Sequence, residues 1–197
     1  MSTRDSEISS DGRNLRRPSA ESGWAAGLAG LGWVAKDLGE RFSPDPDYWD
    51  CNSSFDYALN AADTVDSASL ALALLGLFRA HRTSTGGRVG LAALASAAGF
   101  GVAGLANLLE HCGRLDSLGF AYAIGAMLGF LLLIVFSLAL TRVPLLPSWS
   151  EWLLVVGTIA AVLMARQGGF LLFGVAWMAI AYSVLHRRSA PGLKMGA

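Results

Sequence analysis

Residues 59–78 read LNAADTVDSASLALALLGLF and decide the fold class of this chain. The uninterrupted apolar run within it, 67–78, has 12 residues and would rise about 18 Å as a helix. A hydrocarbon core of roughly 30 Å needs about 20 residues. A membrane span that ends with this run must therefore begin near residue 59, and it takes three polar residues into the bilayer: Asn60, Asp63 and Asp66. Ionisable groups are costly there, so they indicate a functional site with a partner.

The composition is typical of a membrane protein with one domain. Of the 197 residues, 53% are hydrophobic and 15% are charged, whereas a soluble domain has about 25% charged residues. The net charge is zero, which argues against a nucleic-acid partner. Arginine outnumbers lysine, and Ala, Gly and Leu dominate, which favours a bacterial genome of high GC content and a location in the plasma membrane.

Six predicted spans make an all-α, polytopic helical bundle. The surest contains FLLLIVFSLAL, and the last two are short and joined by Arg-Gln-Gly-Gly in a tight hairpin. The first is also short and ends in Lys36 and Asp37, so the alternative is an interfacial helix there and five spans in all. The predicted spans are 23–38, 59–78, 89–109, 118–140, 152–165 and 170–185.

The basic residues predict the orientation, because cytoplasmic loops carry an excess of Lys and Arg. Most of them lie in the N-terminal tail, in the 79–88 loop, at Arg142 and near the C-terminus. Six spans place all of these on one side, so both termini are expected in the cytoplasm. The transmembrane domain is then 22–188, flanked by a disordered tail at 1–21 and a short tail at 189–197.

Cys51 and Cys112 are the two cysteines of the chain. By this topology, each lies in or beside a loop at the outer membrane face, where disulfides form and persist. A Cys51–Cys112 bridge would tie the first outer loop over the helix ends. Two unrelated free thiols are the alternative, because spacing alone does not establish the geometry of a bridge.

Polar side chains recur along one face of the span at 59–78. Asp56, Asn60, Asp63 and Ser67 follow one another at spacings of four, three and four, with Asp66 on the flank. This periodicity places them on one helical stripe. Such a stripe faces a helix bundle or a wet cavity rather than lipid.

Two other helices bring polar groups to the same depth. The span at 89–109 leads into Asn107, Glu110 and His111, and the hairpin after 152–165 carries Arg166. The coincidence of depth predicts an outward-facing polar pocket in the outer half of the membrane. No short motif contributes to this prediction.

These residue types allow several kinds of chemistry. Asp63 lies near Asp66, and Glu110 lies beside His111. Since such titratable pairs can transfer protons, Asp63 and Glu110 are the candidate catalytic groups. The candidate ligand-binding residues are Asn60, Asp66, Asn107, His111 and Arg166. A purely structural role is the alternative, in which the carboxylates pair with Arg166 or Arg114 and fix helix packing. No metal site and no cofactor is predicted, because one histidine among irregularly spaced acids is a weak signal.

Small residues predict close helix packing. Gly125–Gly129 and Gly23–Gly27 are GxxxG patterns, which let helices approach closely and are candidate docking faces for a homo- or hetero-oligomer. The chain contains no Walker A sequence, Rossmann fingerprint, GxSxG, HExxH or CxxC. The sequence therefore predicts no soluble catalytic domain.

The stretch LLPSWSEWLLVVG at 145–157 resembles a segment of small polytopic membrane proteins from high-GC bacteria. In that group, a proline–tryptophan turn leads into a short span and then a glycine-rich hairpin. The resemblance covers residues 59–185 in layout and 145–157 in detail. It implies the topology and no activity.

Four functions remain in competition. The favoured one is binding of a lipid, isoprenoid or other amphiphile in the predicted pocket, with membrane lipids and a hydrophobic small molecule as partners. The second is a membrane-embedded enzyme with Asp63 or Glu110 as general acid, by analogy of size with integral-membrane terpene cyclases. The third is a proton- or cation-coupled transporter or subunit. The fourth is a structural partner of a larger complex, docked through its GxxxG faces.

Overall fold

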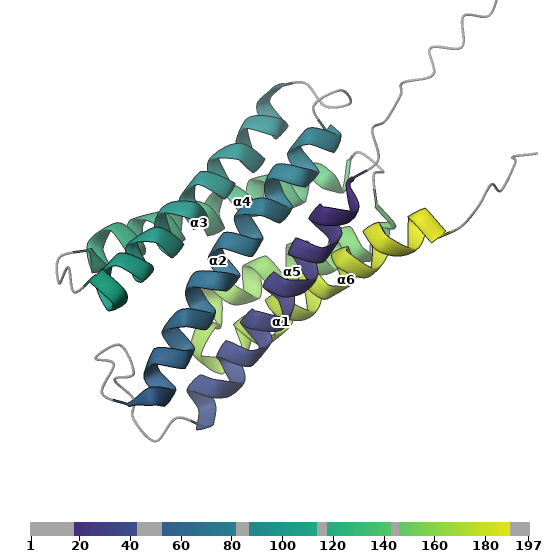
Figure 1. Cartoon of the computed structure of the whole chain (residues 1–197). Coiled ribbons are helices and arrows are strands. Elements are labelled where there is room, and N and C mark those ends of the chain that lie inside the picture. Colours follow the sequence, from purple (N-terminus) through teal and green to yellow (C-terminus); the bar gives the residue numbers. More distant parts are fainter. Residues whose placement is uncertain (1–17, 43–52, 82–86, 114–117, 143–145, 190–197) are drawn as a thin grey trace, which may run out of the picture.

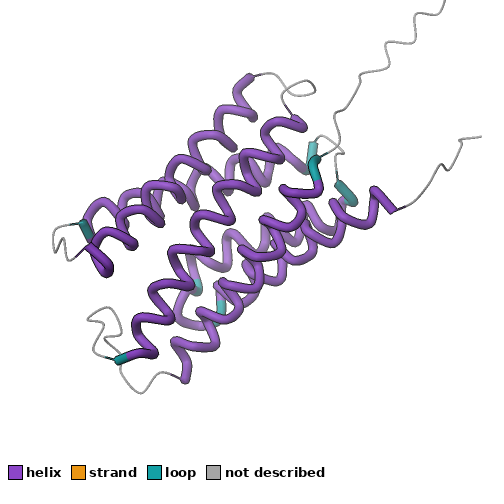
Figure 2. Tube along the Cα trace, viewed as in Figure 1, coloured by secondary structure: helices purple, strands orange, loops and turns teal. Residues whose placement is uncertain are grey.

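The computed structural model describes residues 18–42, 53–81, 87–113, 118–142 and 146–189, which form helices and short connections without a strand (Figure 2). The all-α fold class is confirmed, and each predicted span corresponds to one helix. The helices are α1 (Ala20–Phe42), α2 (Ser54–His81), α3 (Gly87–Gly113), α4 (Gly119–Leu140), α5 (Ser148–Leu163), the short 3-10 helix η2 (Ala165–Gln167) and α6 (Gly169–Ser189).

Helix α2 begins earlier than hydropathy predicts, because a capping box starts it. The Asp56 carboxylate accepts a hydrogen bond from the backbone N–H of Ser53 at 2.7 Å, and the Ser53 hydroxyl accepts one from the N–H of Asp56 at 3.2 Å. These two bonds satisfy donors that the first helical turn leaves free. The apolar run of a span thus predicts which part of the helix lies inside the membrane, whereas the capping residues determine where the helix starts.

The six helices close a ring in chain order (Figure 1). Each helix packs against the one before it and the one after it, and α6 returns to pack against α1. We call the end of the bundle at which α1 ends and α2 begins the first-loop end. The turn between η2 and α6 contains Gly168, whose φ of 100° is a left-handed conformation that favours glycine.

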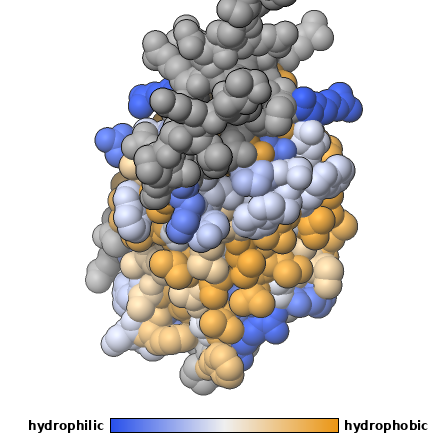
Figure 3. Space-filling model, turned by 90° about the vertical axis from the view of Figure 1, so that its right-hand side faces the viewer, coloured by the Kyte–Doolittle hydropathy of each residue, from blue (hydrophilic) through white to orange (hydrophobic). Residues whose placement is uncertain are grey.

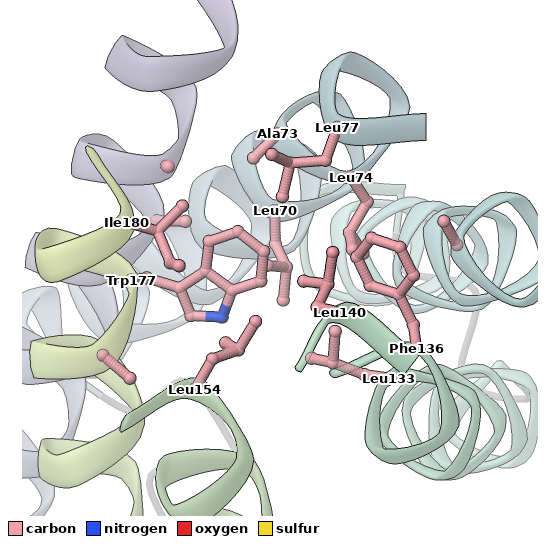
Figure 4. Packing of buried hydrophobic residues seen from close by; sticks show 14 of the residues in the cluster. Leu70, Ala73, Leu74, Leu77, Leu133, Phe136, Leu140, Leu154, Trp177 and Ile180 are labelled. Carbon is pink, nitrogen blue, oxygen red and sulfur yellow. The ribbon is translucent and has the colours of Figure 1, made fainter. Parts of the chain in front are cut away.

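A buried apolar cluster fills the middle of the ring. Trp177 of α6 lies among Leu70 of α2 and Leu154 of α5, and all three are buried (Figure 4). The indole N–H of Trp177 has no hydrogen-bond partner within the described residues, so packing alone holds the ring in place. Other large, fully buried members of the cluster are Leu74, Leu77, Leu133, Phe136, Leu140 and Ile180.

Four helices are long and apolar enough to cross a membrane: Ser54–Ala80, Val89–His111, Gly119–Leu140 and Gly169–His186. Large apolar side chains point outward from them, among them Leu72, Leu91, Leu105, Met127 and Val135. On the face shown in Figure 3, hydrophobic residues gather across the middle and hydrophilic residues lie toward the two ends. This is the surface expected of a membrane protein, whose apolar band contacts lipid.

The other two predicted spans differ from these four. Helix α5 has 16 residues and is a shorter apolar helix, and α1 has 23 residues but does not belong to the four. The structure thus supports four membrane-crossing helices within a six-helix bundle. The count of six spans, the alternative of an interfacial α1 and the cytoplasmic position of both termini stay predictions.

The glycine patterns serve packing inside the chain. A Cβ atom at Gly125 would lie 2.8 Å from the carbonyl oxygen of Gly99, and one at Gly23 would lie 3.0 Å from the side chain of Leu185. The first contact joins α4 to α3 and the second joins α1 to α6. Both GxxxG faces are therefore covered within the bundle, and the predicted oligomer through them is untested in a single chain.

The predicted disulfide is also untested. Cys51 lies outside the described residues, and Cys112 lies in the last turn of α3, where the structure describes the backbone and not the side chain. The bridge stays a prediction.

We predict that Gly99→Ala destabilises the bundle and Gly101→Ala on the same helix does not. A Cβ atom at Gly99 would lie 2.7 Å from the backbone nitrogen of Gly129, whereas one at Gly101 would have no atom within 4 Å. Both changes gain the same helix propensity, so overpacking separates them by about 1–3 kcal/mol in the free energy of unfolding. Thermal unfolding of both variants in detergent measures this difference, and equal melting temperatures would contradict the α3–α4 contact.

Candidate functional site

A buried ion pair joins α1 to α2 toward the first-loop end of the ring. The ammonium of Lys36 donates a hydrogen bond to Oδ1 of Asp63. Lys36 is 3% exposed and Asp63 is 1% exposed, so water screens neither charge. Since removing two charges from water is expensive, the pair needs close geometry and further polar contacts to persist.

Aromatic rings supply part of the surroundings of the Lys36 ammonium. Its nitrogen lies 4.9 Å from the centroid of the Trp33 ring and 5.5 Å from that of Phe170. These distances are within the range of cation–π attraction. The two rings pack against each other at 4.8 Å and continue into the rings of Phe130 and Phe173. The ammonium thus lies over the edge of an aromatic cluster that occupies the centre of the bundle.

Tyr122 brings α4 to the same ion pair. The phenol of this half-buried residue hydrogen-bonds with Asp63 and with Lys36. A phenol can donate and accept at once, so it can bridge the two charges. The ion pair therefore has polar or aromatic neighbours from α1, α2, α4 and α6.

Asp66 is a second carboxylate beside the pair, one turn farther along α2. It is 1% exposed, and its Oδ2 atom is buried without a hydrogen-bond partner within the described residues. It interacts electrostatically with both Asp63 and Lys36. Its other oxygen lies against α1 at Gly32, where a Cβ atom would be 1.4 Å away. Glycine at position 32 therefore leaves the space that the carboxylate fills.

A neutral hydrogen-bond network joins the same helix, α2, to α3. The side-chain amide of Asn107 donates to the carbonyl oxygen of Asn60 at 2.8 Å and to the hydroxyl of Thr64 at 2.9 Å. The amide of Asn60 donates to the carbonyl of Asp56 at 3.0 Å. Asp56 and Asn60 belong to the predicted polar stripe of α2, Thr64 lies on its flank, and Asn107 belongs to α3, so the structure brings these two helices together at predicted polar positions.

The remaining predicted site residues are Glu110, His111 and Arg166. The Glu110 carboxylate lies at the start of α4, where an oxygen would be 3.2 Å from a Cβ atom at Gly119, and Glu110 is partly exposed. His111, also partly exposed, follows it on α3. Arg166 belongs to η2, and its side chain lies outside the described part. The described contacts thus join Asp63 and Asp66 around Lys36, and they join Asn60 to Asn107 in a neighbouring network on the same helix.

Lys36 and Tyr122 belong to this cluster but were not predicted from the sequence. Lys36 lies near the end of the first predicted span. An ionisable group inside an apolar helix is costly and indicates a partner, and this holds for Lys36 as it does for Asp63. Its neighbour Asp37 forms a separate ion pair with Arg41 at 2.7 Å, which leaves Lys36 for Asp63. Tyr122 carries no such signal, because a tyrosine near a helix start also suits a membrane interface.

The described residues contain no group of three or more His, Cys, Asp or Glu side chains able to hold a metal ion. The cluster combines two carboxylates, one ammonium and one phenol in a dry environment, and these groups can exchange protons with one another.

Comparisons with protein-family models, curated proteins and solved structures find no match to this chain. The resemblance of residues 145–157 to small bacterial membrane proteins therefore stays a hypothesis.

We predict that Lys36→Met strongly destabilises the protein, because it leaves the Asp63 charge buried without its cation. The expected loss in the free energy of unfolding is about 3–5 kcal/mol. The double variant Lys36→Met with Asp63→Val should recover most of this loss, since it removes both charges together. Unfolding in mixed detergent micelles measures both.

Arg41→Gln is the matched control for this cycle. The Arg41 side chain is 44% exposed, and it pairs with Asp37 across one turn of α1. Loss of such a pair costs about 0.3–0.5 kcal/mol. If Lys36→Met cost no more than Arg41→Gln, the buried ion pair would not stabilise the fold.

Proposed function

We propose that this chain is an integral membrane protein whose activity is coupled to protonation of the Lys36–Asp63–Asp66 cluster, as in a proton-coupled transporter or transporter subunit. The observation that carries the proposal is the Asp66 carboxylate, which is buried and has an oxygen without a hydrogen-bond partner beside an ion pair that is already complete. Lys36 balances one negative charge, and the cluster has two.

The charge count supports proton binding. One additional positive charge makes the cluster neutral, and a neutral cluster is favoured among apolar helices. A proton is the smallest such charge and needs no cavity. Groups that gain and lose protons inside a helical bundle are typical of pumps and transporters, where protonation shifts the balance between two helix arrangements.

Burial of the cluster bears on the other functions. Lys36, Asp63 and Asp66 are at most 3% exposed, so a substrate or amphiphile reaches them after the helices move apart. Binding of a lipid or isoprenoid, and acid catalysis by Asp63 or Glu110, both need such an opening before any step. Protonation itself needs only a transient chain of water. Both alternatives stay hypotheses. The proton-coupled function is favoured because it does not require the helices to move apart before the first step.

The charge bias of the sequence adds a direction to the proposal. If both termini are cytoplasmic, the first-loop end faces outside and the cluster lies in the outer half of the membrane. Protons then reach it from the external medium. A bacterial plasma membrane, with its proton gradient, is the setting that this arrangement suits.

We predict a pH-dependent carboxylic acid signal from Asp66. The full chain, reconstituted in lipid, should give an infrared difference spectrum between high and low pH with a carboxyl C=O band that shifts in heavy water. Asp66→Asn should remove this band, because the asparagine side chain has no carboxyl group that can bind a proton. Asp37→Asn should retain it, because Asp37 is equally buried but paired with Arg41.

Two results would contradict the proposal. One is a wild-type spectrum without a carboxyl band at any pH at which the protein stays folded. The other is a band of full amplitude in Asp66→Asn, which would assign the proton to a different carboxylate. Monodisperse elution of each variant in detergent is the check on folding.

A further inference from the structure

We infer that the cluster is a binding site for an organic monocation, which it exchanges for a proton, and that the Lys36 ammonium occupies the place of this ligand in the present arrangement. The inference rests on the proposed proton coupling and adds the substrate class. It follows from what surrounds the ammonium rather than from the acidic residues alone.

The surroundings of Lys36 are those that recognise an organic cation. The ring centroids of Trp33 and Phe170 lie 4.9 and 5.5 Å from the nitrogen, and a carboxylate and a phenol are further neighbours. Aromatic faces attract alkylammonium groups and quaternary ammonium ligands in the same way. The Lys36 side chain is itself a primary alkylammonium on a flexible stem, so the site already accommodates that chemistry.

Asp66 provides the charge that a ligand would satisfy. Its Oδ2 atom is buried without a hydrogen-bond partner, and Oδ2 of Asp63 is in the same condition. An entering cation can therefore pair with Asp66 while Lys36 stays with Asp63, or it can replace Lys36 at Asp63. Either way the cluster holds two positive charges against two carboxylates and becomes neutral.

A proton and an organic cation compete for the same negative charge. With Asp66 protonated the cluster is neutral and has no charge to offer, so cation entry releases a proton. With the cation gone, the carboxylate takes up a proton again. The balance is one cation bound for one proton released, and no other reactant is needed.

Few titratable groups face Asp66 from the helices around it. Within the described residues, the charges that act on Asp66 are Lys36 of α1 and Asp63 of α2 itself, and Tyr122 of α4 hydrogen-bonds with these two. The Phe170 ring of α6 lies beside Lys36, Asn107 of α3 is neutral and hydrogen-bonds with Asn60, and Asp37 of α1 is paired with Arg41. The exchange is therefore expected to involve a single proton.

An inorganic cation fits this site less well. Ca²⁺ and Mg²⁺ take six or more oxygen ligands, and Mg²⁺ retains several waters. Here the ammonium has two rings among its neighbours, which offer no oxygen. The described residues also contain no metal-binding group of acids, histidines or cysteines. Aromatic faces with carboxylates select an organic cation instead.

Calorimetric titration of the full chain with tetraethylammonium tests the inference. This probe is a permanent cation with no proton of its own, so any proton released comes from the protein. Titrations in two buffers of different ionisation enthalpy count that proton, and the expected value is close to one in the acidic part of the pH range. The apparent affinity should fall by about tenfold for each unit of pH below the transition.

Variants separate the contributions of the shell. Asp66→Asn should abolish both the binding and the proton release, whereas Asp37→Asn should bind like the wild type. Phe170→Leu should weaken binding by about two- to fivefold, the effect of losing one cation–π contact. Gly32→Ala should also weaken it, because a methyl group there meets the Asp66 carboxylate.

The outcomes distinguish this inference from the proposed function. Absence of tetraethylammonium binding to the wild type, with the carboxyl infrared band present, would overturn the cation site and leave proton coupling standing. Binding without proton release would overturn the exchange. Wild-type affinity in Asp66→Asn would overturn the assignment of the site. Absence of both the infrared band and the binding would overturn the two proposals together. The pH dependence of the wild type needs no variant, so a misfolded mutant does not decide the matter.

Discussion

The structure depends on the constraint that charges within an apolar bundle must be neutralised locally. Lys36 and Asp63 meet this constraint by pairing across α1 and α2, and Tyr122 extends the pair to α4. The same contact fixes the register of α1, a helix that is not among the four apolar enough to cross a membrane. Its position in the ring therefore rests on the ion pair and on close contact with α6, where a Cβ atom at Gly30 would lie 2.6 Å from the carbonyl of Gly174.

Helix α2 shows how one face is divided between two environments. The stripe that carries Asn60 and Asp63 toward the first-loop end continues as Leu70, Leu74 and Leu77 toward the other end. The leucines join the cluster around Trp177, which is dry and closely packed (Figure 4). The polar cluster thus ends one turn before an apolar barrier. In the proposed proton-coupled function, this barrier would keep a proton at Asp66 from the other end of the bundle until the helices move, as alternating access requires.

Much of this was predictable from the sequence, and the parts that were not have physical reasons. Periodicity placed Asn60 and Asp63 on one stripe, and helix rise put Asn107 at their depth; both inferences agree with the Asn107–Asn60 hydrogen bond. The partner of Asp63 was not predicted, because Lys36 was interpreted only as the charged end of the short span at 23–38. Nor does a hydropathy pattern tell which helices become neighbours. The closure of α1 on α6 brings Phe170 to Lys36, and only the fold shows it.

The choice of lysine at position 36 is informative in this setting. An arginine would serve a purely structural pair better, since its planar fork bonds a carboxylate at two points and it stays charged throughout. Lysine presents a compact ammonium on a flexible stem, with donors that can turn from one acceptor to another. Beside it stand two carboxylates three residues apart, and each has a buried oxygen without a hydrogen-bond partner. A group built only for stability would leave neither oxygen unsatisfied, because each such atom costs free energy. This composition supports the proposed exchange of partners at the cluster more than a purely structural ion pair.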